Sequence, residues 1–243
     1  MSDQVNFGDE IVTPEEKTRR VGEVFSSVAR RYDLMNDLMS GGMHRLWKSR
    51  FVDRVKPRAG EAILDMAGGT GDIAFRMAER GAAVTVADIN ADMLAVGRER
   101  AAQREITGLD WALENAEALR FTDSRFDAYT IAFGIRNVTD IPAALGEAYR
   151  VLKRGGRFYC MEFSTSDWPG FARLYEGWAD NVIPRLGKAV TDDEESYRYL
   201  VESIRRFPRP KAFAEMIGQA GFVRAGFEPM LGGLVAIHHG WKI

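Results

Sequence analysis

The sequence predicts an α/β fold: a mostly parallel, seven-stranded sheet with helices on both faces and an antiparallel C-terminal strand pair. Between residues 61 and 163, short buried strand patterns alternate with helical patterns, as in right-handed βαβ units. Glycines follow several of the expected strands and helices. The 243 residues are 46% hydrophobic and 28% charged, which is typical of a globular chain with a sizeable core.

The N-terminal part predicts a loose arm over residues 1–12 and then a helical cap over residues 13–56. Helix-starting signals stand at Thr13–Glu16, where a capping residue precedes a proline at the first helical position. Apolar residues then recur at helical spacing from Val21 to Tyr32. A second helical stretch follows a break at Gly41-Gly42, and its apolar positions are Trp47, Phe51 and Val55.

The central part, residues 61–163, predicts five strands and three helices. The strands are expected at 62–66, 84–88, 109–113, 126–133 and 157–163. The helices are expected at 72–80, 91–104 and 141–152, with a turn at 153–156.

The last third predicts a helical insertion over residues 164–222, followed by a strand pair within residues 223–243. A helix at 213–220 is expected to end at Gly221. Because neither a repeat nor a low-complexity linker interrupts the chain, residues 1–243 are predicted to form a single domain.

Composition excludes several classes of function. The 33 basic and 35 acidic residues give a net charge of −2, so the chain lacks the basic field of a nucleic-acid binder. A single cysteine, Cys160, excludes a disulfide framework and a Cys-rich metal site, and no metal is expected. Neither a membrane-spanning run nor a secretory signal is present, which predicts a cytoplasmic protein.

A glycine turn is the most informative motif. The strand at 62–66 runs into Gly68–Gly71, and a helix begins at Asp72. Glycines allow positive φ and let a ligand approach the backbone, and ligands of open α/β sheets bind at the carboxyl ends of the strands. Gly69-x-Gly71-x-x-Ala74 also matches the dinucleotide fingerprint, so a nicotinamide oxidoreductase stays open as an alternative.

Carboxylates around this turn favour a cationic cofactor. Asp65 precedes the turn, Asp72 opens the helix and Asp88 ends the second strand. A pyrophosphate would be repelled here, whereas S-adenosylmethionine carries an ammonium and a sulfonium and has no phosphate. Asp88 can accept ribose hydroxyls from either cofactor. Asp72 alone is equally well explained as a helix-favouring first-turn residue.

Several longer motifs resemble the UbiE/MenG-type C-methyltransferases of ubiquinone and menaquinone biosynthesis. The resemblance covers residues 20–243 and implies a Rossmann-like class I methyltransferase fold. The motifs are Arg31–Asp37, His44–Lys48, Asn115–Leu119, Phe133–Asp140, and Ser196–Leu200 with Glu202–Ile204.

The resemblance implies S-adenosylmethionine as cofactor, bound by Thr70, Asp88, Asn115 and Ala116. The residue pattern adds Asp65, Gly69 and Gly71 to the candidate cofactor-binding residues. Two positions depart from the family. Ala132 stands where members often have Ser, and Arg120 replaces a usual Pro.

The implied reaction methylates a ring carbon of a polyprenylated benzoquinol or of demethylmenaquinol, and the sequence leaves open which. A class I methyltransferase acting on another small phenolic or lipid substrate is the main alternative, and a non-enzymatic cofactor-binding scaffold is another.

The apolar tail implies peripheral contact with the inner membrane surface. Association with other quinone-biosynthesis enzymes and a homodimer stay open. An apolar cluster after the fifth strand either lines the entry of the tail or buries the insertion: Trp168, Phe171, Leu174, Tyr175, Trp178 and Ile183.

The candidate catalytic residues are Arg136 and Asn137, which follow the fourth strand, and Tyr197, in a region expected to close over the substrate. Arg136 would stabilise a phenolate, or else form a salt bridge with a carboxylate such as Asp140. Tyr197 would contact the substrate or pack between helices. Among the remaining candidates, His44 is a weaker site residue, whereas His238, His239 and Cys160 are expected to be structural.

Overall fold

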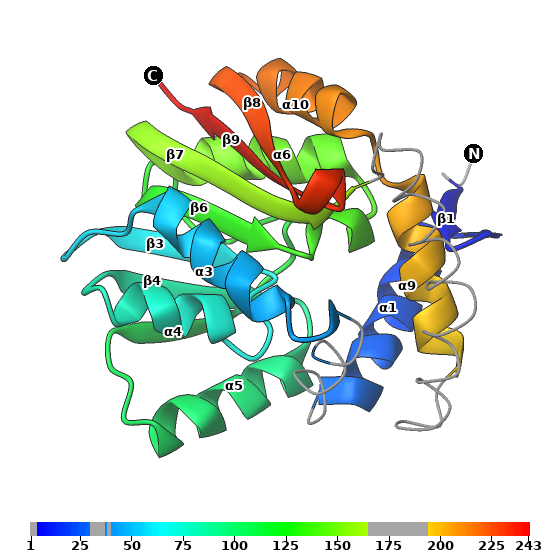
Figure 1. Cartoon of the computed structure of the whole chain (residues 1–243), viewed down its shortest axis with the longest axis horizontal. Helices are drawn as coiled ribbons and strands as arrows, with labels where there is room; N and C mark the ends of the chain where they lie inside the picture. The colour runs from blue at the N-terminus through cyan, green and yellow to red at the C-terminus, as the bar shows by residue number, and fades with distance from the viewer. Residues whose placement is uncertain (1–3, 30–36, 38–39, 165–193) are drawn as a thin grey trace.

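A computed structural model of the chain describes residues 4–29, 37, 40–164 and 194–243 (Figure 1). The aromatic cluster predicted between Trp168 and Ile183 lies outside these residues, as do Arg31–Asn36 of the first family motif. Within the described residues, none of the helices is long and apolar enough to cross a membrane.

The seven-stranded sheet predicted from the sequence is present, in the order β5-β4-β3-β6-β7-β9-β8. The first five of these strands pair in parallel, and β9 pairs antiparallel with both β7 and β8. This confirms the expected mostly parallel sheet with an antiparallel C-terminal pair. The strands are β3 (Ala62–Met66), β4 (Ala83–Asp88), β5 (Leu109–Leu113), β6 (Phe126–Ala132), β7 (Leu152–Phe163), β8 (Val223–Met230) and β9 (Val235–Trp241).

Helices cover both faces of this sheet, and alternate residues of each strand pack against opposite layers (Figure 1). Ile63 of β3 contributes to the core under one layer, whereas Leu64 contributes to the core under the other. This double burial explains why the parallel strands appear as short apolar runs. The first layer contains α3 (His44–Val55), α4 (Asp72–Ala78) and α5 (Ala91–Gln103), and the second contains α6 (Ile141–Val151) and α10 (Pro210–Gln219).

The N-terminal arm is more ordered than the sequence predicts. Residues 1–12 were expected to be loose, but β1 (Val5–Phe7) and β2 (Glu10–Val12) form an antiparallel hairpin. Gly8 has a φ of +55° in the turn, a conformation that glycine adopts at little cost. The hairpin is anchored because the Phe7 ring is buried and stacks on Tyr199, with ring centroids 4.3 Å apart.

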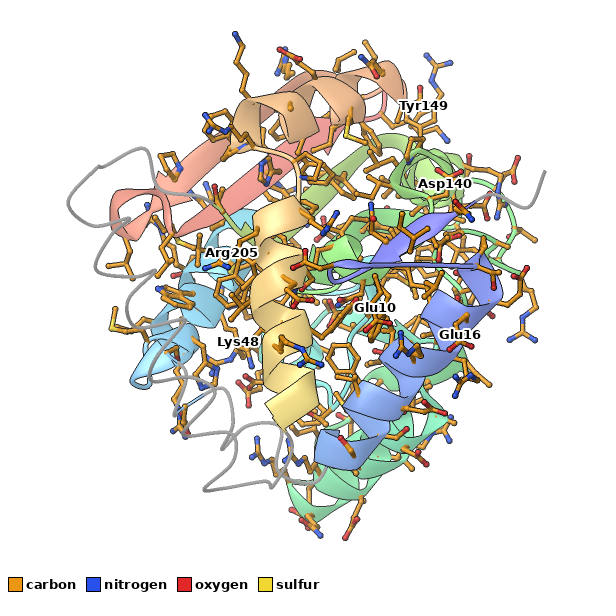
Figure 2. The ribbon with its side chains drawn as sticks, turned by 90° about the vertical axis from the view of Figure 1, so that its right-hand side faces the viewer. Glu10, Glu16, Lys48, Asp140, Tyr149 and Arg205 are labelled. Atoms are coloured by element: carbon orange, nitrogen blue, oxygen red, sulfur yellow. The ribbon has the colours of Figure 1, made fainter. Side chains whose placement is uncertain are left out.

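Helix α1 (Pro14–Val28) begins as predicted, since the Thr13 side chain accepts a hydrogen bond from the Glu16 N–H at 3.2 Å. Helix α9 (Glu194–Arg206) lies against the β1–β2 hairpin, where Arg206 forms an ion pair with Asp9 at 2.7 Å. Figure 2 views α9 from the front, with α1 and the hairpin on one side of it and α3 on the other.

The turn expected at residues 153–156 belongs to strand β7 instead. Pairing with β6 changes register there, because Phe126 lies opposite Leu152 whereas Ala128 lies opposite Arg157. Gly155 and Gly156 do not pair with β6 and form a bulge at this point. The Gly155 N–H donates instead to the Lys242 carbonyl at 2.7 Å. These glycines therefore mark a bulge in a strand rather than its beginning.

Candidate active site

A cavity opens at the carboxyl ends of β3, β4 and β6, where the fold class predicts a ligand. The structure brings most of the predicted site residues together around it. Gly71 and Arg136 are not among the lining residues. Those that line it are Asp65, Gly69, Thr70, Asp88, Asn115, Ala116 and Asn137.

The glycine turn at the floor of this cavity requires glycine for two reasons. Gly69 and Gly71 have φ values of +54° and +86°, which side chains rarely adopt. The turn is also tightly packed, because a Cβ at Gly68 would lie 2.7 Å from Val86 Cγ1. Gly71 occupies the N-cap position of α4, and a Cβ there would meet the Phe75 ring at 2.6 Å.

Asp88 is fixed by the backbone at the end of β4. The Gly69 N–H donates to its Oδ2 and the Asn90 N–H donates to its Oδ1, each at 2.9 Å. Burial raises the pKa of this carboxyl to about 6, although these backbone donors favour the charged form. Each oxygen keeps acceptor capacity, so Asp88 can also receive hydroxyl groups from a ribose.

Asp65 is the more exceptional carboxylate. Its Oδ1 accepts a hydrogen bond from the Thr130 hydroxyl at 2.7 Å, whereas its buried Oδ2 has no hydrogen-bond partner among the described residues. Burial, with a smaller contribution from the nearby charges of Asp88 and Asp72, raises the pKa of Asp65 to about 7, although the hydrogen bond from Thr130 favours the charged form. A buried acceptor without a donor is costly, and a cationic ligand would supply the missing donor.

Asp72 contributes less to the acidic field than its position in the sequence suggests. Its Oδ2 accepts a hydrogen bond from Lys48 Nζ at 2.8 Å, and Arg76 Nε lies 3.4 Å from its Oδ1. Burial alone would raise the pKa of Asp72, but the two cations outweigh it and the pKa lies below its usual value. The expected acidic set around the turn therefore reduces to Asp65 and Asp88.

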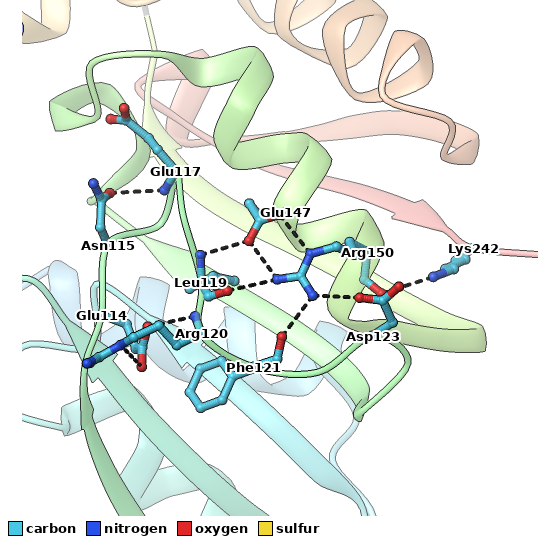
Figure 3. A network of polar contacts seen from close by, with 10 residues as sticks. All are labelled: Glu114, Asn115, Glu117, Leu119, Arg120, Phe121, Asp123, Glu147, Arg150 and Lys242. Atoms are coloured by element: carbon cyan, nitrogen blue, oxygen red, sulfur yellow. Dashed lines mark hydrogen bonds and ion pairs between the residues drawn. The ribbon is translucent and has the colours of Figure 1, made fainter.

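Thr70 and the loop after β5 also line the cavity. The Thr70 hydroxyl accepts a hydrogen bond from Arg100 of α5 at 3.0 Å. Asn115 is exposed and caps its own loop, because its Oδ1 accepts the Glu117 N–H at 3.0 Å, and the neighbouring Ala116 is buried (Figure 3). This loop presents a small apolar residue beside an amide, a combination suited to an adenine ring.

Arg120, the departure from the usual proline, holds the same loop. Its backbone N–H donates to Glu114 Oε2 at 3.0 Å, and its side chain forms an ion pair with the same carboxylate at 3.2 Å (Figure 3). A proline has no N–H and would lose the first of these bonds. Arg120 therefore anchors this loop through two contacts with Glu114.

Arg136 lies in a buried ion pair. It belongs to the short 3₁₀ helix η2 (Ile135–Asn137), and its Nη1 lies 2.9 Å from Glu162 Oε1 of β7. The side chains are 4% and 0% exposed. The Nη1 group also donates to the Phe133 carbonyl, and Nε donates to the Ser203 hydroxyl at 3.3 Å. The salt bridge that the sequence left open as an alternative is thus present, with Glu162 rather than Asp140 as partner.

Asn137, the neighbour of Arg136, lines the cavity, and its orientation is fixed by α9. The Tyr199 hydroxyl donates to Asn137 Oδ1 at 3.0 Å, which leaves the amide N–H groups of Asn137 as donors. Burial raises the pKa of Tyr199 to about 12, so this hydroxyl keeps its proton. Tyr197 also belongs to α9, but its side chain lies outside the part of the chain that the structure describes.

Sequence reasoning missed Lys48, Glu162 and Tyr199 as site residues. A signal for Tyr199 exists, because Tyr199 and Ser203 are four residues apart and share the buried face of α9. Glu162 offers no signal of its partner, since it follows the apolar run Phe158–Met161 and Arg136 is 26 residues away in the chain.

The remaining candidates lie outside this cavity. His44 bonds to Asp37, with Nε2 2.7 Å from Oδ1, and does not line the cavity. Burial lowers the pKa of His238 to about 4, and its ring packs against Phe213 with centroids 4.8 Å apart, in keeping with a structural role. Cys160 is fully buried in the core.

The residues around the cavity fit S-adenosylmethionine. The unpartnered oxygen of Asp65 suits the ammonium, Asp88 suits the ribose, and the compact glycine turn leaves space that any side chain would fill. The buried carboxylate of Asp65 beside the glycine turn would repel a pyrophosphate, which disfavours the nicotinamide alternative.

Comparisons with known proteins agree with this assignment. The chain is 61% identical over 241 residues to the ubiquinone/menaquinone biosynthesis C-methyltransferase UbiE of Zymomonas mobilis, an alignment that covers 99% of this chain and 100% of the relative. It is 58% identical to the protein of the same name from Methylobacterium nodulans, over 98% of this chain and 96% of the relative.

Solved structures share the fold at low sequence identity. A SAM-dependent methyltransferase from Aquifex aeolicus superposes with a TM-score of 0.59 and 12% identity, covering 81% of this chain and 89% of that chain. Phosphoethanolamine N-methyltransferase 2 of Haemonchus contortus, in complex with S-adenosyl-L-methionine, gives a TM-score of 0.60 and 16% identity, covering 81% and 52%. These neighbours show a class I methyltransferase fold. Because the family model for ubiE/COQ5 methyltransferases matches residues 13–242, the chain belongs to the ubiE/COQ5 methyltransferase family.

Proposed function

We propose that this chain methylates a ring carbon of a polyprenylated benzoquinol or of demethylmenaquinol. Membership of the family makes it a SAM-dependent C-methyltransferase of the UbiE type. The observation that carries the proposal is the cavity itself, which has buried carboxylates suited to a cationic methyl donor on one side. On the other side, Asn137 offers an oriented amide suited to a ring oxygen.

The chain's own residues would hold the two reactants. Bound S-adenosylmethionine supplies a methyl group on a positively charged sulfur. Asp88 would accept the ribose hydroxyls, Asp65 would face the ammonium, and Asn115 with Ala116 would contact the adenine. Orienting two reactants in this way accounts for several kcal/mol of a methyl-transfer barrier.

The substrate side needs a way to favour an ionised ring hydroxyl, because a ring carbon is a weak nucleophile until a neighbouring oxygen carries negative charge. Asn137 can donate an amide N–H to that oxygen, since Tyr199 occupies its carbonyl oxygen. Phe133 lines the same cavity and packs against Phe163, with ring centroids 4.7 Å apart, so this wall excludes water from the aromatic ring.

Arg136 is better described as a positioning residue than as a contact for the phenolate. Its guanidinium faces Glu162 and Ser203, and it lines a second cavity together with Tyr199 and Lys17. Its role in this proposal is to hold η2, and therefore Asn137, against β7.

The polyprenyl tail places the reaction at a membrane surface. A strongly apolar tail partitions into the bilayer, so the ring reaches the cavity only when the protein is at the interface. The proposal therefore includes peripheral contact with the inner membrane, with the protein otherwise in the cytoplasm.

The test is a methylation assay with labelled S-adenosylmethionine and two acceptors, a demethylated benzoquinol and demethylmenaquinol. We expect label in a ring methyl group of one or both quinones. Label on oxygen, or on a sterol or simple phenol in preference to both quinols, would contradict the proposal. An Asp88→Ala variant serves as the matched negative control, because it removes the expected ribose contact. Calorimetry with NAD and S-adenosylhomocysteine tests the oxidoreductase alternative in parallel.

A further inference from the structure

We propose that Lys48 binds the carboxylate of the amino-acid end of S-adenosylmethionine, paired with Asp65 at the ammonium. This inference rests on the proposed cofactor and adds a residue to its site. Lys48 belongs to α3 rather than to the glycine turn, and it reaches the cavity from the helix layer above the sheet.

The charges around the cavity point to this residue. Among the described residues that line it, four carry carboxylates, and Lys48 is the one with a cationic side chain. A ligand carboxylate placed near Asp65 and Asp88 without a cation beside it would be repelled. The four acidic residues are Asp65, Asp72, Asp88 and Glu117.

Lys48 is also set up to accept a second partner. Its side chain is only 7% exposed, and Asp72 Oδ2, at 2.8 Å, is the hydrogen-bond acceptor found for Nζ among the described residues. An ammonium group has three N–H donors, so further donors are available to a ligand. Asp72 acts as a positioning residue here, because it holds Nζ at the cavity wall.

The ligand has matching charges at one end. The amino-acid part of S-adenosylmethionine carries an ammonium and a carboxylate on the same carbon. Asp65 presents a buried oxygen without a donor, and the Lys48 charge lies close enough to act on the ionisation of Asp65. An acceptor and a donor group therefore line one region of the cavity, as a zwitterion requires.

The experiment measures ligand binding by calorimetry with three compounds. S-adenosylhomocysteine carries both charged groups, its decarboxylated analogue keeps only the amine, and 5′-methylthioadenosine has neither. In the wild-type protein, we expect loss of the carboxylate to weaken binding by about 10- to 100-fold, the range for a charge-assisted hydrogen bond.

Two variants then assign this difference to its residue. Lys48→Met keeps the length of the side chain and should abolish the preference for S-adenosylhomocysteine over the decarboxylated analogue, whereas Lys48→Arg should retain most of it. Asp65→Asn should instead weaken both amine-bearing ligands and leave 5′-methylthioadenosine unchanged. Arg76→Met is the matched control, since Arg76 also faces Asp72 but does not line the cavity.

Two results would overturn the inference. The first is a wild-type protein that binds the decarboxylated analogue as tightly as S-adenosylhomocysteine, a result that needs no variant to fold. The second is a Lys48→Met variant that weakens all three ligands equally, because that would mean a structural role. The protein could show the expected preference for S-adenosylhomocysteine over its decarboxylated analogue and yet methylate neither quinol. That result would support the proposed role of Lys48 and contradict the proposed substrate.

Discussion

Replacing Arg136 with alanine should cost the protein much of its stability, whatever happens to its activity. The substitution leaves Glu162, which is fully buried, without its cation. Breaking a buried ion pair from one side typically costs about 3–5 kcal/mol, because the remaining charge has neither water nor a partner. The variant also loses the bonds from Arg136 to the Phe133 carbonyl and to Ser203.

The size of this loss should depend on pH in a definite direction. Burial raises the pKa of Glu162 even in the intact pair, and removal of Arg136 would raise it further. When the pKa of a carboxyl is higher in the folded state than in the unfolded state, its contribution to stability is fully present at a pH below the unfolded-state pKa. This contribution is lost as the pH rises through the folded-state pKa. The defect of Arg136→Ala should therefore grow from about pH 4.5 upward and be small below it.

Urea denaturation at several pH values, followed by circular dichroism, measures both effects. Arg136→Met combined with Glu162→Gln provides the control, because removing both charges should recover about 2 kcal/mol relative to Arg136→Ala at pH 8. A destabilisation below about 1 kcal/mol, or one that does not change with pH, would refute this reasoning. If the prediction holds, lost activity in Arg136→Ala reports a misplaced η2 and not a lost catalytic group.

The remaining predictions concern the cavity, its glycine turn and the C-terminal strands. The pKa values of Asp65 and Asp88 are about 7 and about 6, so both carboxylates become protonated as the pH falls from 8 to 5.5. Calorimetry should therefore show S-adenosylhomocysteine binding weaken over this range, while the ligand-free protein gains stability. Binding that does not change with pH would contradict the charge argument. Tyr199→Phe keeps the ring that stacks on Phe7 but loses the hydroxyl bonded to Asn137, so kcat should fall about 3- to 10-fold with an unchanged KM for the cofactor. Gly71→Ala should lower the free energy of unfolding by about 1–3 kcal/mol in thermal melts, because φ is +86° and Phe75 blocks the new Cβ. His238→Phe should reduce the loss of stability between pH 6.5 and 4, since the folded-state pKa of His238 is about 4.

Local patterns were enough to predict most of the sheet. The bounds of β3 and β5 agree with the sequence prediction because each is a short, mostly apolar segment with a glycine close to at least one end. The prediction was wrong where a long-range bond decides the structure. Gly155 and Gly156 have the composition of a turn, but their backbone pairs with Lys242, nearly ninety residues away in the chain. Similarly, the N-terminal arm is ordered because Phe7 stacks on Tyr199 of a distant helix.

The residues of the candidate site also divide into those that local sequence patterns predict and those that depend on long-range packing. Asp65 and Asp88 were predicted because each stands at the end of a recognisable strand next to a glycine turn. Lys48 was not, since nothing in α3 shows that its side chain reaches across to Asp72, 24 residues later. Such pairings depend on how helices pack on the sheet, and a single sequence carries little information about that packing.

The position of β9 also constrains the order in which the protein folds. β9 lies between β7 and β8 and supplies hydrogen bonds to both, so β8 has no place in the sheet until β9 has inserted. Until Val235–Trp241 pairs, the parallel strands end in an open β7 edge, whose backbone N–H and C=O groups have no partner strand. A folding intermediate that lacks β9 should therefore expose this edge, and it is a candidate for edge-to-edge aggregation.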